Sequence, residues 1–330
     1  MSRTLYQTNT FFKRTIDRYC DLASNQGFCD FLPLIKNLEG DTSDYGTDAT
    51  QLAITYIQIA LSMLWQSWGV NPSRVISHSL GHYAALNTAG VLSEADTIFA
   101  VGIRAQMLRE NCRPGTHSML VVRADEHEVQ PFLDSYDVEV ACINSPLEIV
   151  LSGERLKIET CREALGISGI RSMVLDIPYA FHSSQVDCIL KDFEMALRGI
   201  NFKAPSIPVI CPRMTAVVRK ERLFNSAHLV EHFRNSVNIV DAIRVAKKEN
   251  FVGAHTQILE IGHNSTFSAI LGANLGNSCN VHASFKKDMD NWASLTEASQ
   301  SLYISGLDIR WDQFHRDFFV PPLGPRASSL

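Results

Sequence analysis

The sequence predicts an α/β protein that contains a smaller unit built around an antiparallel sheet. A short strand, a serine-containing turn and a helix follow one another over residues 74–88, an arrangement found in α/β proteins. Residues 50–68 form an almost entirely apolar helix, which has to lie inside a larger body. Residues 117–178 alternate strands and helices in the order βαββαβ, as a small ferredoxin-like unit requires. The 330 residues suffice for one large domain with a smaller insertion.

The first third of the chain is expected to be mainly helical. Helices are predicted over residues 11–36 and 50–68. The most apolar run of the second helix, Leu52–Trp65, is interrupted by three polar residues and is too short to cross a bilayer. We therefore expect a buried helix there and no association with a membrane. After the serine turn, a helix over Ala84–Thr88 is expected to stop at Gly90.

A further helix is predicted from Ser93 to about Asn111. Ser93 followed by Asp96 has the spacing of an N-terminal cap, and an acid in the first turn interacts favourably with the helix dipole. The dipeptide Pro114-Gly115 then separates this helix from the βαββαβ segment.

The βαββαβ segment divides the chain into parts. Its strands are predicted at SMLVVRA, VEVACIN, EIVLSG and IRSMVLDI, and its helices at DEHEVQPFLDSY and RLKIETCREALGIS. Farther along, residues 258–262 (ILEIG) are typical of a buried parallel strand, and the end of the chain is expected to hold a closing helix and an extended tail with Trp311 and Pro321-Pro322. The predicted parts are a large subdomain (residues 1–116 and 179–295), a small subdomain (residues 117–178), and a C-terminal helix and linker tail (residues 296–330).

Composition and charge argue against several classes of protein. The formal net charge is -5 and no run of basic residues is present, so nucleic-acid binding is not expected. The eight cysteines form no CxxC pair, and the N-terminal MSRTLYQTNTFFKR has no apolar signal core. We therefore expect reduced thiols in a cytoplasmic protein.

The stretch VISHSLGHYAAL, residues 75–86, combines two motifs. His78 and His82 have the i, i+4 spacing of a zinc-binding helix. Such a helix needs a glutamate beside the first histidine and a third ligand, but Ser79 occupies the glutamate position. Gly81 would also weaken the interior of that helix. We therefore expect no metal site.

The alternative is a nucleophile elbow, in which a strand turns sharply into a helix and exposes a serine. The residues two positions away on each side have to be small, and Ser77-x-Ser79-x-Gly81 fits this pattern. The amide of Leu80, at the start of the helix, is then placed to stabilise an oxyanion. The pattern alone does not separate this interpretation from a serine that caps an ordinary helix.

A serine nucleophile needs a base, and the sequence offers eleven histidines. His182, in PYAFHSS, follows directly on the last strand of the βαββαβ segment. From that position it can reach across a cleft to the elbow. The alternative interpretation is that His182 is a structural histidine whose hydrogen bonds are satisfied within the fold.

Arg104 is a further candidate functional residue. Apolar residues surround it on all sides of the helical wheel in IFAVGIRAQML, so the guanidinium is expected to be buried or to line a pocket. A buried cation needs an anion. That anion is either an Asp or Glu of the chain or the carboxylate of a substrate, which arginine binds through two parallel hydrogen bonds.

Three separated motifs resemble one known family. SHSLGHYAALNTAGVLSEADTIFAVGIRAQML, PYAFHSSQVD and SLYISGLDIRWDQFHRDF are similar to the acyltransferase domain of fungal iterative polyketide synthases, of the malonyl-CoA:ACP transacylase type. The similarity is closest to the non-reducing group and extends from about Leu5 to Phe318. It implies an α/β-hydrolase-like large subdomain with an inserted ferredoxin-like small subdomain, and a thioester held in the cleft between them.

The resemblance also implies roles for particular residues. Ser79 corresponds to the serine that becomes acylated, and His182 corresponds to its general base. Arg104, 25 residues after the serine, corresponds to the arginine that pairs with the free carboxylate of malonyl, and the Leu80 amide helps to form the oxyanion hole. The remaining predicted substrate-binding residues are Phe181, which accompanies malonyl specificity, Gln51, His78 and His232.

The implied partners are malonyl-CoA as substrate, an acyl carrier protein with its phosphopantetheine arm, and other polyketide synthase domains. No bound cofactor or metal is expected. Two alternatives stay open: a serine thioesterase or hydrolase, with a late histidine such as His263 or His282, and a non-catalytic docking piece.

The sequence departs from the family pattern at several points. Ser77 replaces a glycine, His82 replaces a common glutamate, and Gly262-His263-Asn264 stands where Gly-Pro-His is usual. The chain also begins after the position of the family's first strand and its Gly-Gln-Gly turn, which supply a second oxyanion donor. We therefore expect a fragment or a truncated product, with reduced activity.

Overall fold

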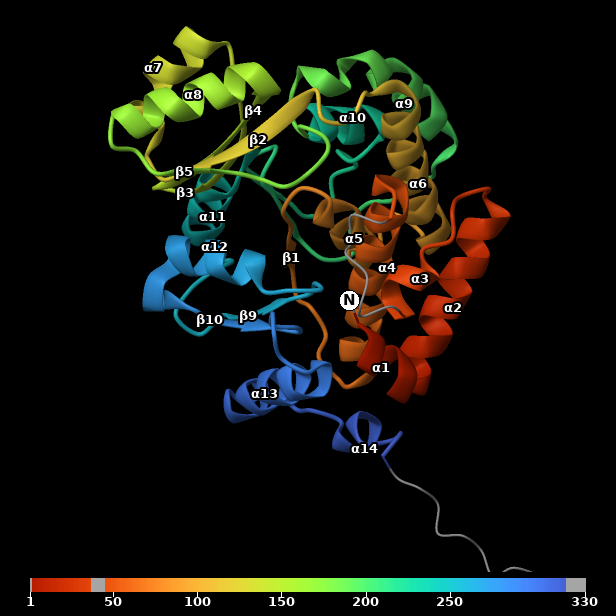
Figure 1. Ribbon diagram of the computed structural model, residues 1–330. Helices are drawn as coiled ribbons and strands as arrows, with labels where there is room; N and C mark the ends of the chain where they lie inside the picture. Colours follow the sequence, from red (N-terminus) through yellow and green to blue (C-terminus); the bar gives the residue numbers. More distant parts are fainter. Residues whose placement is uncertain (1, 37–44, 319–330) are drawn as a thin grey trace, which may run out of the picture.

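The computed structural model describes residues 2–36 and 45–318, and within them the strands form three sheets (Figure 1). The strands are β1 (Val75–Ile76), β2 (His117–Val122), β3 (Glu139–Ser145), β4 (Glu148–Glu154), β5 (Ser172–Val174), β6 (Val209–Cys211), β7 (Ala216–Val218), β8 (Val237–Asn238), β9 (Gln257–Glu260) and β10 (Asn280–Ala283). The helices are α1 (Arg3–Thr8), α2 (Thr10–Asn25), α3 (Leu32–Lys36), α4 (Thr47–Ser67), α5 (Gly81–Thr88), α6 (Glu94–Asn111), α7 (Glu126–Tyr136), α8 (Arg155–Ile167), α9 (Leu190–Ala196), α10 (Ser226–Arg234), α11 (Ile239–Lys248), α12 (Thr266–Leu275), α13 (Asn291–Ile304) and α14 (Trp311–Phe314).

The largest sheet confirms the predicted βαββαβ order. Its strands lie in the order β5-β2-β4-β3-β8, and the first four are antiparallel neighbours from the predicted segment. β8 comes from the rest of the chain and pairs with β3 in parallel. Helices α7 and α8 cover one face of the sheet, while α11 and α12 contact β3 (Figure 1). The fold is thus α/β with a ferredoxin-like unit, whereas the exact boundaries of the two subdomains stay a prediction.

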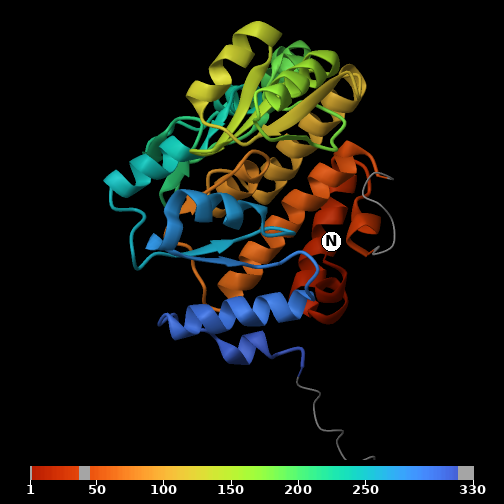
Figure 2. The same cartoon turned by 60° about the vertical axis from the view of Figure 1, so that its left-hand side comes forward.

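Two smaller sheets belong to the remainder of the chain. β6 lies between β1, which is parallel to it, and β7, which is antiparallel. β9 and β10 form a parallel pair with α12 on one side and α13 on the other (Figure 2). The strand predicted at residues 258–262 is therefore present as β9. Its expected burial is wrong for Ile258, Leu259 and Ile261, which are only half-buried because the sheet has two strands.

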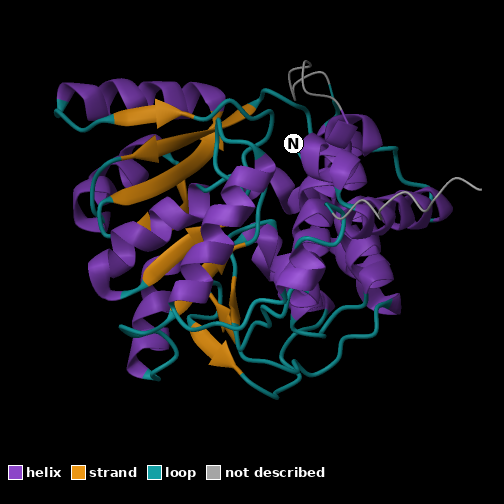
Figure 3. Ribbon diagram, turned by 90° about the horizontal axis from the view of Figure 1, so that it is seen from below, coloured by secondary structure: helices purple, strands orange, loops and turns teal. Residues whose placement is uncertain are grey.

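A helical body lies beside the sheets. Figure 3 shows the strands gathered on one side of the molecule and helices without strands on the other. Helix α4 is its centre and contacts α2, α5 and α6. The apolar residues Leu52–Trp65 are mostly buried there, as predicted. No helix among the described residues is long and apolar enough to cross a membrane.

Two expectations for the ends of the chain were wrong, and one helix was not predicted. The predicted helix over residues 11–36 ends at Asn25, because Gly27 adopts a φ of 81° and turns the chain before α3. Helix α1 precedes it and was not predicted. Trp311 belongs to the short helix α14 and not to an extended tail. Pro321-Pro322 lies outside the described residues.

Replacing Gly102 by alanine is expected to lower the free energy of unfolding by about 1–3 kcal/mol, the usual cost of overpacking. A Cβ atom at Gly102, in α6, would lie 2.5 Å from the ring of Phe28. Gly166 in α8 is the matched control, because nothing lies within 4 Å of its added Cβ and alanine there should stabilise the helix. Urea unfolding of both variants measures the difference, and a gain in stability from Gly102→Ala would contradict the predicted clash.

Candidate active site

Ser79 lies in a sharp turn between β1 and α5. Its φ is 46°, in the left-handed region that residues other than glycine rarely adopt. Such a backbone costs about 1–2 kcal/mol, which the surrounding fold has to supply. β1 ends at Ile76, and the N-cap of α5 is Leu80. The predicted elbow is therefore present, and the interpretation of Ser79 as the cap of an ordinary helix is wrong.

His182 lies directly against the Ser79 hydroxyl. Its Nε2 is 2.8 Å from Ser79 Oγ, and its Nδ1 is 2.9 Å from the backbone carbonyl oxygen of Asn235. A carbonyl oxygen only accepts hydrogen bonds, so Nδ1 carries the proton. Nε2 is then left with the lone pair that can take the proton of Ser79. The structure thus brings together the residues predicted as nucleophile and base.

The environment of His182 keeps the imidazole neutral. The residue is 2% exposed. Burial lowers the pKa of His182 to about 3, and the charge of Arg104 and the ring of His78 act in the same direction. Because the unprotonated form persists far below neutral pH, this histidine is available as a proton acceptor throughout the physiological range.

Arg104 is buried beside this pair without an acidic partner. Its side chain is 3% exposed, and no ion pair joins it to any Asp or Glu of the described residues. Its guanidinium carbon lies 4.2 Å from the centre of the Phe233 ring and 5.4 Å from that of Phe181. Burial lowers the pKa of Arg104. The interpretation of Arg104 as half of an internal ion pair is therefore not supported within the described chain.

Gln51 provides the one side-chain hydrogen bond that the described residues give to the Arg104 guanidinium. Arg104 Nη1 donates to Gln51 Oε1, while Arg104 Nε and Gln51 Nε2 are buried without a partner among the described residues. The Arg104 guanidinium thus contacts aromatic rings and one amide and keeps unused N–H donors. Such a group is suited to binding the carboxylate of a substrate.

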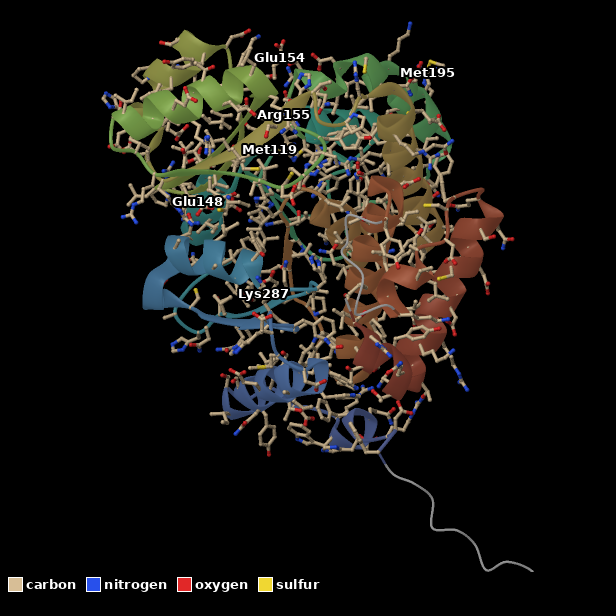
Figure 4. The ribbon with its side chains drawn as sticks, in the orientation of Figure 1. Met119, Glu148, Glu154, Arg155, Met195 and Lys287 are labelled. Atoms are coloured by element: carbon tan, nitrogen blue, oxygen red, sulfur yellow. The ribbon has the colours of Figure 1, made fainter. Side chains whose placement is uncertain are left out.

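His78 connects the elbow to the ferredoxin-like sheet. Its Nε2 lies 2.8 Å from Oδ1 of Asn144 on β3, so the ring donates there. Asn144 Nδ2 in turn donates to Glu148 Oε1 at 2.9 Å; Glu148 is labelled in Figure 4. Burial lowers the pKa of His78. His78 therefore lies between β1 and the ferredoxin-like sheet, next to Ser79.

The zinc helix considered for His78 and His82 is not formed. The two rings have separate partners, because His78 turns to Asn144 and His82 Nδ1 lies 3.0 Å from Ser77 Oγ. His82 Nε2 lies 2.8 Å from His228 Nε2. The two rings therefore point to different partners and do not form the paired ligands of a zinc-binding helix.

His232 hydrogen-bonds to the backbone of Ser79. Its Nε2 lies 3.0 Å from the carbonyl oxygen of Ser79, so it donates to that oxygen. Its ring packs at 4.3 Å from the ring of His82 and at 5.9 Å from that of His182. These contacts support a positioning role for His232 more directly than the predicted contact with substrate.

The Leu80 amide is free for an oxyanion. It makes no hydrogen bond to the described residues, and it stands at the start of α5. Backbone donors at a helix start stabilise negative charge. The Leu80 amide therefore has no competing partner within the described chain, and its role as an oxyanion donor stays a prediction.

Sequence reasoning missed Asn235, Asn144 and Phe233. Asn235 acts through its backbone carbonyl, which any residue provides, so no side-chain signal exists. Asn144 and Phe233 are brought to the site by strand and helix packing over long sequence separations. The predicted Phe181 and Gln51, in contrast, both contact Arg104.

The late histidines proposed for a hydrolase do not reach the elbow. His263 Nε2 contacts Asn264, and His282 Nε2 contacts Gln257. The base position beside Ser79 is taken by His182, whose Nδ1 is held by a backbone carbonyl and not by an acid. The hydrolase arrangement is therefore absent from the described residues.

An α/β fold with an inserted ferredoxin-like sheet and a Ser–His pair at a strand–helix elbow defines the class of acyltransferases. A family model described as acyl transferase domain matches residues 1–308. The chain belongs to this family.

Sequence relatives and solved structures agree with the family. The chain is 43% identical over 323 residues to "Non-reducing polyketide synthase VdtA" of Byssochlamys spectabilis and 39% identical over 320 residues to "Conidial yellow pigment biosynthesis polyketide synthase" of Emericella nidulans. Both alignments cover 96% of this chain but only 14% and 15% of those proteins. The acyltransferase domain from the second module of the salinomycin polyketide synthase has a TM-score of 0.85 at 28% identity, covering 100% of this chain and 75% of that one.

Proposed function

We propose that the chain transfers a malonyl group from malonyl-CoA, through an ester of Ser79, to the phosphopantetheine thiol of an acyl carrier protein in polyketide synthesis. The observation that carries the malonyl assignment is the buried Arg104 cation, which has no acidic partner within the described chain and lies near the Ser–His pair. The similarity to polyketide synthases supports the carrier protein and further synthase domains as partners.

The first half-reaction forms the acyl-enzyme. His182 Nε2 takes the proton of Ser79 as Oγ attacks the thioester carbonyl carbon, and the Leu80 amide donates to the resulting oxyanion. Arg104 binds the distal carboxylate, so the reacting carbonyl is held against Oγ. The carbon–sulfur bond then breaks, and the CoA sulfur leaves with the proton from His182.

The second half-reaction reverses these steps with a new thiol. His182 takes the proton of the phosphopantetheine thiol, whose sulfur attacks the carbonyl of the malonyl ester. The ester bond to Oγ breaks, and His182 returns the proton to Ser79. These proton transfers use residues of the chain alone, so we propose that no cofactor or metal takes part in them.

The proposed location is the cytoplasm. The eight cysteines, all among the described residues, are free thiols, which suits a reducing compartment.

The function is tested by incubating the purified chain with radiolabelled malonyl-CoA and a phosphopantetheinylated carrier protein. Label should first appear on the peptide that contains Ser79 and then on the carrier. Labelled acetyl-CoA, which lacks the distal carboxylate of malonyl-CoA, is the matched control and should react more slowly. Absence of protein-bound label, or equal rates with both donors, would contradict malonyl transfer.

The rate of acyl-enzyme formation is expected to stay constant between about pH 7.5 and pH 5. A histidine with the usual pKa near 6.5 would be mostly protonated at pH 5, which would slow the step about 30-fold. The pKa of His182 is lowered to about 3, so its neutral form persists as the pH falls through this window. Rapid-quench measurement of kcat/KM checks this, and a tenfold loss per pH unit that begins near 6.5 would show an ordinary histidine.

A further inference from the structure

Behind the elbow lies a cluster of His82, Cys211 and His228, which has no part in the proposed transfer. The three residues are buried, and their ligand atoms all lie within 4.8 Å of one another. It is the one group of this kind among residues 2–36 and 45–318. Histidine nitrogen and cysteine sulfur are the ligands that zinc prefers in proteins.

The three residues come from elements that surround the nucleophile. His82 is in the first turn of α5, directly after the elbow. Cys211 ends β6, the strand that pairs with β1 before the elbow. His228 is on α10, the helix that also carries His232. A bound ion would therefore join the strand layer, the elbow helix and the helix that holds the Ser79 carbonyl.

The two imidazoles present their Nε2 atoms to the cluster. These atoms lie 2.8 Å apart, so one neutral ring now donates to the other. His82 Nδ1 contacts Ser77 Oγ at 3.0 Å, and a proton on Nδ1 leaves Nε2 free to bind a metal. A partner on the far nitrogen is a common feature of metal-binding histidines. His228 Nδ1 has no partner among the described residues and can likewise carry its ring's proton.

Two backbone amides, those of Arg213 and Met214, hydrogen-bond to the Cys211 sulfur, and the Arg213 guanidinium lies near it. Burial nevertheless raises the pKa of the Cys211 thiol, so the sulfur is protonated without an ion. A bound zinc ion would replace that proton, as metal binding to cysteine generally does. Arg213 is itself paired with Glu231, which offsets its positive charge near the site.

The spacing of the ligand atoms is close to that of a zinc site. Bonds of about 2.0–2.3 Å in tetrahedral geometry place neighbouring ligand atoms about 3.3–3.7 Å apart. The nitrogen pair at 2.8 Å has to open slightly, and the sulfur has to approach within the 4.8 Å spread.

We propose that His82, Cys211 and His228 bind a zinc ion that fastens the elbow to β6 and α10. The three side chains leave the fourth tetrahedral position to a water molecule, and the ion does not enter the acyl transfer. This inference is independent of the proposed function, because metal binding is measured without any acyl substrate.

Cobalt titration of the metal-free full chain tests the site directly. One equivalent of Co²⁺ should bind and produce a near-ultraviolet thiolate-to-cobalt band together with intense visible bands of a tetrahedral ion. Zinc should then displace cobalt and remove these bands. Cys211→Ser should abolish the thiolate band, and His228→Gln should weaken binding by more than about 100-fold, since loss of an outer-shell partner alone costs about 10- to 100-fold.

Cys142→Ser is the matched control, because Cys142 is a buried free cysteine on β3 outside the cluster. It should keep the full thiolate band. If Cys211→Ser does not fold, pulsed alkylation of the wild-type chain in partly denaturing urea replaces it, because Cys211 and Cys142 are both buried in the folded chain: zinc should protect Cys211 more strongly than Cys142 in peptide mass spectra. No thiolate band in the wild type, an unchanged band in folded Cys211→Ser, or no zinc protection of Cys211 would each overturn the proposal.

Discussion

Ser79→Ala is expected to abolish the acyl-enzyme and to lower transfer of malonyl to a carrier protein by about 10⁴-fold or more, the scale of losing a catalytic nucleophile. Ser79 Oγ lies 2.8 Å from His182 Nε2, and no other described hydroxyl is bonded to that nitrogen. Without Oγ, the base has no proton to accept and the thioester has no attacking atom. Intact-protein mass spectrometry after incubation with malonyl-CoA measures the ester, and a carrier-protein assay measures transfer.

Ser73→Ala provides the control for this experiment. Ser73 lies in the exposed segment before β1, six residues ahead of the nucleophile, and its side chain contacts only Arg74 among the described residues. Its removal should leave both the ester and the transfer rate unchanged. Malonyl ester retained at the wild-type level in Ser79→Ala would exclude Ser79 as the acyl carrier. Alanine also tolerates the φ of 46° about as well as serine, so the fold should persist.

The principal site residues were predictable because each leaves a local signature. Ser79 lies between small residues after a short strand, Arg104 is surrounded by apolar residues on its helix, and His182 follows the last strand of a recognisable βαββαβ string. These patterns indicated which three side chains were candidates for the site. The family resemblance, and not the pattern, assigned their roles.

The features that the sequence did not reveal depend on long-range packing or on the backbone. The carbonyl of Asn235 fixes the tautomer of His182, but a carbonyl has no residue-specific signal. The same holds for the positive φ of His182, whereas the strained backbone of Ser79 is part of the predicted elbow. The zinc helix that the sequence analysis considered and set aside for His78 and His82 is not formed, because α5 begins only at Gly81 and the elbow separates two residues that an uninterrupted helix would place on one face.

Four buried histidines near Ser79 differ in their hydrogen-bond partners. Burial lowers the pKa of His82, His182, His228 and His232 alike, so all four are neutral at physiological pH. Only His182 presents a lone pair to a nucleophile, since His232 donates to the Ser79 carbonyl. His182 is therefore distinguished as the proposed base by its hydrogen-bond geometry and not by its pKa.

Arg104→Ala is expected to slow malonyl transfer by at least about 100-fold while acetyl transfer falls by less than about tenfold. A bidentate guanidinium–carboxylate contact contains two charge-assisted hydrogen bonds, each worth about 1.5–3 kcal/mol. Acetyl has no distal carboxylate and therefore cannot use this contact. Because Arg104 pairs with no acid among the described residues, its removal leaves no buried negative charge behind, and the variant should fold. The measurement is kcat/KM for each donor in the same carrier-protein assay.

Arg109→Ala separates the carboxylate contact from a general effect of losing an arginine on α6. Arg109 lies on the same helix five residues later, and its half-exposed side chain pairs with Asp48. Its removal should leave the ratio of malonyl to acetyl kcat/KM at the wild-type value. Equal losses for the two donors in Arg104→Ala would show that this cation maintains the shape of the site and does not bind the malonyl carboxylate. A selective loss of malonyl transfer in Arg104→Ala, together with an unchanged ratio in Arg109→Ala, would assign the preference for malonyl to Arg104. This preference then follows from the structure, because no acidic side chain of the described residues pairs with that buried guanidinium.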